Sequence, residues 1–153
     1  MRGDAGLGYV GPARASHIDS AFVRGHDAAM IQTLAYVALG GAVGASARYL
    51  TGVAAIRVMG PGFPWGTLTV NVVGSFVMGA VVVLLAHLSA TRFAPFLMTG
   101  VLGGFTTFSA FSLDAVTLWE RGAVTQAAVY TGASVVLSLT ALVAGLALAR
   151  ALT

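Results

Sequence analysis

The sequence predicts an all-α integral membrane protein with four transmembrane helices, the third of which is broken at mid-membrane. Of the 153 residues, 58% are hydrophobic and only 8% are charged, whereas soluble domains carry about 25% charged residues. Each of the long apolar stretches exceeds the ~20 residues that a membrane-spanning helix needs. They cover approximately residues 31–56, 65–88, 93–118 and 123–149. The linkers between them are short, so consecutive helices should be antiparallel neighbours.

Residues 1–29 differ in composition from the rest of the chain. They are rich in Gly, Ala, Arg and Asp, and they contain neither a sustained apolar run nor a recognisable secretory signal. We expect a disordered extension here, followed by a four-helix membrane domain over residues 30–153. The alternative is that translation starts at Met30, where the first apolar stretch begins.

Composition argues against several classes of function. The chain contains no cysteine, which excludes disulfides and thiol catalysis. The three histidines are scattered without metal-ligand spacing, and no nucleophile motif or phosphate-binding glycine loop is visible, so we do not expect an enzyme. The net charge is only +3 and no basic run exists. The arginines are therefore expected to anchor helices at the interface rather than to bind nucleic acid.

The arginines in the loops leave the membrane orientation undecided. Counted from Met30, Arg92 and Arg150 lie on one side of the membrane, and Arg57 and Arg121 lie on the other. The positive-inside rule needs an excess on one side, and a chain without such an excess can insert in both orientations. The three arginines of residues 1–29 add a bias if that segment is made.

Small residues recur at a spacing of four along three of the apolar stretches. The pairs are Gly40–Gly44, Gly100–Gly104 and Ser75–Gly79. This spacing lets the backbones of two membrane helices approach closely. We interpret it as helix packing rather than as a functional site.

The stretch that packing explains least is Gly-Gly-Phe-Thr-Thr-Phe-Ser-Ala-Phe-Ser over residues 103–112. Paired glycines followed by threonines weaken a helix, and a break at membrane depth is tolerated only inside protein or beside a cavity. Carbonyls freed at such a break can bind a small hard cation. Phe108 and Phe111 share a helix face beside Ser109 and Ser112. Ring edges and hydroxyls in this arrangement can face a dehydrated anion.

Three other polar features lie at membrane depth. Asn71 must face protein or water, so it either makes an interhelical hydrogen bond or offers N–H donors to an anion. Tyr130, Ser134 and Ser138 recur every four residues and form one polar stripe, which serves either packing or a pathway. Arg48 either snorkels to the interface or places a positive field at the mouth of a cavity.

Three motifs, in order along the chain, resemble the CrcB/Fluc family of fluoride channels. They are Gly-Gly-x-x-Gly-x-x-x-Arg-Tyr over residues 40–49, Trp-Gly-Thr-x-x-x-Asn-x-x-Gly-Ser-Phe over 65–76, and the run over 103–112. The resemblance extends over about residues 31–148. It implies a lipid-embedded channel in the plasma membrane, built as an antiparallel dual-topology homodimer with two pores. Some members pair with a second, similar chain, so a heterodimer stays open.

The resemblance also implies roles for individual residues. A structural sodium ion would be held at the break by backbone carbonyls at Gly103 and Thr106 of both subunits, and Arg48 would lie at the vestibule. The chain departs from the family at two positions, with Ala110 where Thr is frequent and Asp114 where Glu is common. With the hydroxyls beside the phenyl rings included, the expected fluoride pathway comprises Asn71, Phe108, Ser109, Phe111, Ser112, Tyr130, Ser134 and Ser138.

The resulting hypothesis is a channel domain over residues 30–153 that passively exports fluoride from the cytoplasm and lowers its toxicity. Two other interpretations stay open. A small dual-topology multidrug exporter needs a membrane-embedded carboxylate. Asp114 is the only candidate, and it lies near a helix end. A membrane assembly subunit would have no transport activity of its own.

Overall fold

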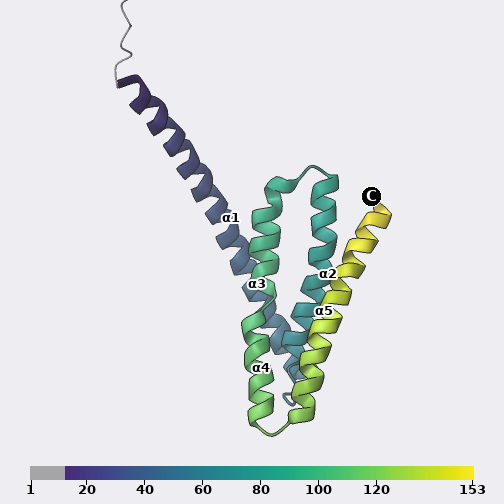
Figure 1. The fold of residues 1–153 in the computed structure, drawn as a ribbon. Helices are drawn as coiled ribbons and strands as arrows, with labels where there is room; N and C mark the ends of the chain where they lie inside the picture. The colour runs from purple at the N-terminus through teal and green to yellow at the C-terminus, as the bar shows by residue number, and fades with distance from the viewer. Residues whose placement is uncertain (1–12) are drawn as a thin grey trace, which may run out of the picture. The chain divides into compact units, whose positions relative to one another are not determined.

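The computed structural model describes the backbone of residues 13–153 and the side chains of Asp27 and of residues 29–153. All regular elements in this part of the chain are helical (Figure 1). They are α1 (Ala13–Met59), α2 (Trp65–His87), η1 (Thr91–Phe93), η2 (Pro95–Leu102), α3 (Gly103–Phe105), α4 (Phe108–Glu120) and α5 (Val124–Leu152). The chain divides into two compact units, Met1–Leu34 and Ala35–Thr153. Every site discussed below lies in the second unit.

Four helical spans are long and apolar enough to cross a membrane. Large apolar side chains on them are exposed, for example Leu39 and Leu113, as expected for surfaces that face lipid or a partner subunit. The prediction of an all-α protein with four transmembrane helices is therefore confirmed, with ends close to those expected. The spans are Ala29–Met59, Trp65–His87, Thr91–Glu120 and Val124–Leu152.

Helix α1 begins at Ala13, inside the segment for which the sequence analysis expects disorder. The expectation rested on a composition rich in Gly, Ala, Arg and Asp and on the absence of a sustained apolar run. Residues 13–29 contain several alanines and two arginines, which are among the strongest helix formers. Residues 1–12 lie outside the described residues, and a start at Met30 stays a prediction.

The third span is assembled from several unlike pieces. A 3₁₀ turn leads into a π-helix over Pro95–Leu102, and one further helical turn ends at Phe105. Thr106 then adopts φ −81° and ψ 157°, and Thr107 adopts φ −155° and ψ 118°. Both residues are extended, so the helix is interrupted before α4 begins (Figure 1). The predicted break is confirmed and is placed at the two threonines.

Glycines allow α1 to pack closely against the first half of the third span. A Cβ atom added to Gly100 would lie 2.9 Å from the Cα of Gly40, and one added to Gly104 would lie 2.8 Å from the carbonyl oxygen of Gly41. Any larger side chain would force the two backbones apart. The two GxxxG pairs thus pack against each other, as the spacing predicts.

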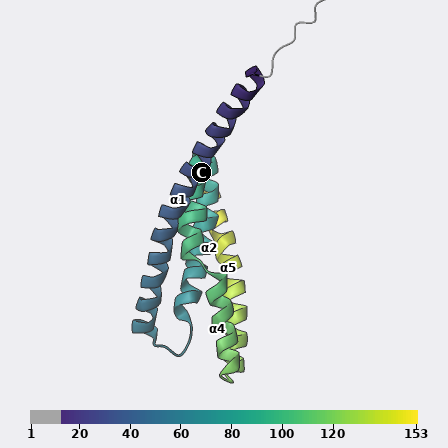
Figure 2. The same cartoon turned by 90° about the vertical axis from the view of Figure 1, so that its left-hand side faces the viewer.

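A second close contact joins α2 and α5, which run side by side (Figure 2). A Cβ on Gly79 would collide with the carbonyl oxygen of Leu142, and one on Gly145 would collide with that of Phe76. This packing fixes α5 against α2. It thereby places the polar stripe of α5 near Asn71 of α2.

Candidate functional site

The side chain of Asn71 holds the break from the side of α2. Its Oδ1 accepts a hydrogen bond of 2.8 Å from the backbone N–H of Thr107, and its Nδ2 donates one of 3.1 Å to the carbonyl oxygen of the same residue. An amide is suited to this task because it carries an acceptor and a donor side by side. The interhelical hydrogen bond considered for Asn71 is therefore present.

These bonds change the backbone bonding at the break. In a continuous α-helix, each N–H donates to the carbonyl four residues earlier, so the N–H of Thr107 would donate to Gly103 and that of Ala110 to Thr106. Here the N–H of Thr107 goes to Asn71, and the N–H of Ala110 goes to Oγ1 of Thr107 at 3.1 Å. Thr107 thus caps the N-terminus of α4. The carbonyls of Gly103 and Thr106 lose their helical donors.

Thr106 fits closely against α2. A Cβ added to Gly74 would collide with the Thr106 methyl group and would approach the Phe105 ring at 3.2 Å. The Thr106 hydroxyl donates to the carbonyl oxygen of Leu102 at 2.9 Å. The Thr106 hydroxyl therefore uses its hydrogen within its own helix.

A cavity of about 350 Å³ lies against the break. Its walls come from α2, from the two extended threonines, and from α4 and α5. It brings together five residues of the predicted pathway, which belong to three separate helices. These are Asn71, Phe108, Phe111, Ser134 and Ser138.

Two hydroxyls at this cavity lack partners. The Oγ atoms of Ser134 and Ser138 are buried and make no hydrogen bond to any described residue. A buried polar group without a partner lowers the stability of the fold by about 1–3 kcal/mol. Neither hydroxyl avoids this loss by a hydrogen bond to a carbonyl of its own helix. Ser134 and Ser138 are therefore candidate hydrogen-bond donors to a polar species that enters beside them.

The two phenyl rings of the cavity form a tilted pair. The centroids of Phe108 and Phe111 lie 5.3 Å apart, at an interplanar angle of 44°. Phe111 is only 9% exposed, whereas Phe108 is 78% exposed, so one ring is anchored in the protein and the other projects from the subunit. The positively polarised edges of such rings can face an anion without a full charge nearby.

Tyr130 lies apart from this cavity. It is completely buried, and its hydroxyl donates to Oδ2 of Asp114 at 3.2 Å. Its ring packs against Phe111 at 5.5 Å and meets Phe63 edge-on, also at 5.5 Å. The polar stripe of α5 therefore runs from this buried pair to the cavity.

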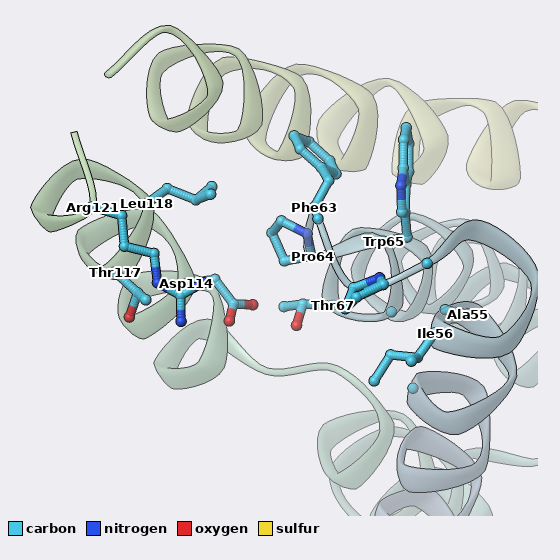
Figure 3. A pocket seen from close by; sticks show the side chains of 15 residues that line it. Ala55, Ile56, Phe63, Pro64, Trp65, Thr67, Asp114, Thr117, Leu118 and Arg121 are labelled. Carbon is cyan, nitrogen blue, oxygen red and sulfur yellow. The ribbon is translucent and has the colours of Figure 1, made fainter. Parts of the chain in front are cut away.

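A second cavity of about 300 Å³ opens beside Asp114, near the end of α4 (Figure 3). Its walls come from α1, from the turn before α2, from the first turn of α2 and from the last turns of α4. The Asp114 carboxylate and the Thr67 hydroxyl point toward each other, and Arg121 lies on the same wall as Asp114. This end of the bundle is therefore polar and charged.

The comparisons with known proteins agree on one family. A family model described as CrcB-like protein, Camphor Resistance (CrcB), matches residues 35–146. This chain belongs to the CrcB family. A relative from Cereibacter sphaeroides named "Fluoride-specific ion channel FluC" is 67% identical over 121 residues, which are 79% of this chain and 97% of the relative.

Two further relatives carry the same name. The one from Ruegeria sp. is 62% identical over 122 residues, covering 79% of this chain and 97% of the relative. The one from Agrobacterium fabrum is 59% identical over 119 residues, which are 76% of this chain and 95% of the relative. These names describe CrcB-family channels rather than enzymes, in agreement with the prediction that the chain is not an enzyme. The predicted resemblance is confirmed, and the chain is a multi-pass membrane protein of this family.

The remaining predicted residues of this CrcB-family chain lie outside the cavity. Ser109 shares a contact of 3.1 Å with the Thr107 hydroxyl, and the Ser112 hydroxyl bonds back to the carbonyl oxygen of Phe108 at 2.9 Å. Arg48 is half-buried on α1 and is not among the described side chains that line either cavity. Their assigned roles stay predictions.

The bond between Asp114 and Tyr130 was not predicted from the sequence. Tyr130 was assigned to the pathway, and Asp114 was considered both as a departure from the family and as the carboxylate that a multidrug exporter would need. A usable signal existed, because the two residues stand equally far before and after Gly122, which turns the chain between α4 and α5 with φ +78°. Residues placed symmetrically about the turn of a helical hairpin tend to face each other.

Proposed function

We propose that this chain is a fluoride-selective channel through which fluoride leaves the cytoplasm passively. The observation that carries the proposal is the cavity beside the break, which is lined both by two serines whose buried hydroxyls lack partners and by a pair of phenyl rings. Fluoride is small and strongly hydrated, so a pathway must replace its water with donors and yet release it. The names of the relatives support fluoride as the ion.

Each group at the cavity has a distinct part in this proposal. Ser134 and Ser138 donate O–H groups to the ion. Asn71 lines the cavity and has one N–H left after its bond to Thr107, which it can donate to the ion. Phe108 and Phe111 present ring edges, which attract an anion weakly enough to let it leave. Arg48 draws anions to the vestibule by its charge.

The direction of flow follows from the membrane potential. A negative interior drives an anion outward with about 2.3 kcal/mol per charge for each 100 mV. Hydrogen fluoride enters as a neutral molecule and ionises inside, so fluoride accumulates and then leaves through the channel. No coupling to ATP or to protons is required.

A structural sodium ion fits the break. Sodium is a hard cation that prefers oxygen ligands, and freed carbonyls at helix breaks are suitable ligands. The carbonyls of Gly103 and Thr106 have lost their helical donors because those N–H groups bond elsewhere. Gly103 is exposed in the single subunit, so a second subunit could contribute its own carbonyls. When bound, the ion would supply positive charge at the centre of the assembly.

The assembly that suits this arrangement is an antiparallel homodimer. The exposed Phe108 ring and the exposed Gly103 are then covered by the partner, and the balanced loop arginines permit both orientations. A heterodimer with a similar chain is the alternative. Mass spectrometry of the complex purified from its native membrane distinguishes the two, because a second polypeptide would appear in equal amount.

Growth in fluoride tests export. Expression in a bacterium without its own fluoride exporter should restore growth in medium containing fluoride, and the variant Ser134→Ala/Ser138→Ala, made in equal amount, should restore it poorly. If the wild-type protein is present in the membrane but growth stays fluoride-sensitive, export by this chain alone is contradicted.

A further inference from the structure

We propose that Asn71 and Thr107 are positioning residues that create the cation site by drawing two backbone N–H groups away from the carbonyls that bind the ion. The inference rests on the sodium ion of the proposed function and assigns its affinity to two side chains that do not touch it. Asn71 holds both backbone groups of Thr107, and the Thr107 hydroxyl takes the N–H of Ala110.

The first step concerns the N–H of Thr107. Thr107 is only 8% exposed, so its backbone N–H must find a partner inside the protein. The intrahelical alternative is the carbonyl of Gly103, four residues earlier. That bond would extend α3 through the break and would occupy the Gly103 carbonyl. By accepting this N–H, Asn71 leaves the carbonyl available to an ion.

The second step concerns Thr106. Its carbonyl would normally accept from Ala110, but that N–H is held at 3.1 Å by Oγ1 of Thr107. A threonine or serine hydroxyl at the N-cap satisfies such a donor well. Thr107 therefore has two roles. Its side chain caps α4 and so releases the carbonyl of Thr106, and its backbone groups bind Asn71.

The third step is that only an amide side chain at position 71 can make both bonds to Thr107. A carboxylate at position 71 would accept the N–H but could not donate to the Thr107 carbonyl, and an apolar side chain would do neither. The bonds cross from α2 to a residue 36 positions later, so they also fix α2 against the break. Gly74, one turn along α2, leaves the space that the Thr106 methyl group fills.

The test compares the sodium requirement of isosteric variants. Full-length protein is moved into sodium-free buffer, and two quantities are measured: the sodium retained per chain, by atomic absorption, and the thermal midpoint as sodium is added back. Asn71→Leu and Thr107→Val each remove hydrogen-bonding groups at nearly constant volume. Thr107→Ser keeps the cap and serves as the conservative rescue. Ser138→Ala lines the same cavity without a bond to the break.

We expect Asn71→Leu and Thr107→Val to lose retained sodium and to need about tenfold more sodium for half-maximal stabilisation. Thr107→Ser and Ser138→Ala should match the wild-type sodium requirement. If Asn71→Leu does not fold, Thr107→Val alone carries the comparison, because it leaves the bonds between α2 and the break intact.

Two outcomes would overturn the inference, and they are distinguishable. If Asn71→Leu and Thr107→Val keep the wild-type sodium content and requirement, the two residues do not set the site, even where fluoride flux falls. If the wild-type protein conducts fluoride but neither retains nor responds to sodium, the sodium ion itself is wrong and this inference fails with it, while the channel function stands.

Discussion

The hydroxyl of Tyr130 donates to Oδ2 of Asp114 across 3.2 Å and joins α5 to α4 inside the bundle. Tyr130 is wholly buried, so this hydrogen bond fixes α4 and α5 against each other beside the cavity that Asp114 lines.

Replacing Tyr130 with Phe should therefore destabilise the protein without creating a cavity. The ring stays, but the Asp114 carboxylate loses a donor in a partly buried position, which costs about 1–3 kcal/mol. The free energy of unfolding in detergent, measured with a denaturant, checks this value. Tyr49→Phe is the matched control, because Tyr49 is 70% exposed. Equal effects of the two substitutions would show that the bond contributes nothing.

Adding a methyl group at the contact between α2 and α5 should disrupt folding. A Cβ on Gly79 or Gly145 would collide with a backbone carbonyl of the opposite helix, and a backbone cannot move aside as a side chain can. We expect Gly79→Ala and Gly145→Ala to lose the folded protein, seen by size-exclusion chromatography. Gly132→Ala, in the same helix as Gly145, meets nothing within 4 Å and should gain up to about 1 kcal/mol from helix propensity. Normal yields of Gly79→Ala would refute the close packing.

Removing the cavity hydroxyls should separate function from stability. Ser134 and Ser138 have buried oxygens without partners, so replacing either with Ala removes an unsatisfied group and should leave stability unchanged or raise it by about 1 kcal/mol. Fluoride flux should nevertheless fall, because the ion loses a donor. Thermal midpoints and efflux rates measured on the same preparations check both parts. A variant that loses stability and keeps its flux would show a purely structural role.

The ring edges should matter to the rate rather than to assembly. Phe108→Ile and Phe111→Ile keep apolar volume but remove the polarised edge, so both should slow fluoride efflux while the proposed dimer persists. Phe93→Ile is the control, because Phe93 lies at the start of the third span and outside the cavity. Unchanged efflux in both cavity variants would refute the role of the rings.

The arginines of residues 1–29 should bias the orientation. With Arg2, Arg14 and Arg24 present, the side that also carries Arg92 and Arg150 has five arginines against two, Arg57 and Arg121, on the other, which favours a cytoplasmic N-terminus.

The chain contains no cysteine, so the substitution Thr153→Cys introduces the only thiol that a labelling reagent can modify. The side of the membrane on which this thiol is labelled reports the orientation. We expect that thiol to be largely cytoplasmic in the full chain and to divide between both sides in a chain that starts at Met30. An even division in the full chain would show that the three arginines have no effect.

The four spans and the break could be predicted from the sequence because each depends on local composition. Apolar length predicts a span, and Gly103 and Gly104 followed by two threonines predict a weak helix. The polar stripe of α5 could also be predicted, because helical spacing alone brings Ser134 and Ser138 to one face.

The features that needed the structure depend on distant residues. Nothing near Asn71 indicates that its amide would bind Thr107, 36 residues away. The π-helix over Pro95–Leu102 is a change of hydrogen-bond register, and neither composition nor spacing reports such a change.

The most direct test of the account is ion efflux from liposomes that contain the purified protein. Liposomes loaded with fluoride, and a second set loaded with chloride, are given an outward driving potential, and release is followed with ion-selective electrodes. A fluoride-selective channel should give rapid fluoride release without proton coupling, and no chloride release above that of empty liposomes. Folded protein that releases no fluoride, or that releases both anions equally, would contradict it.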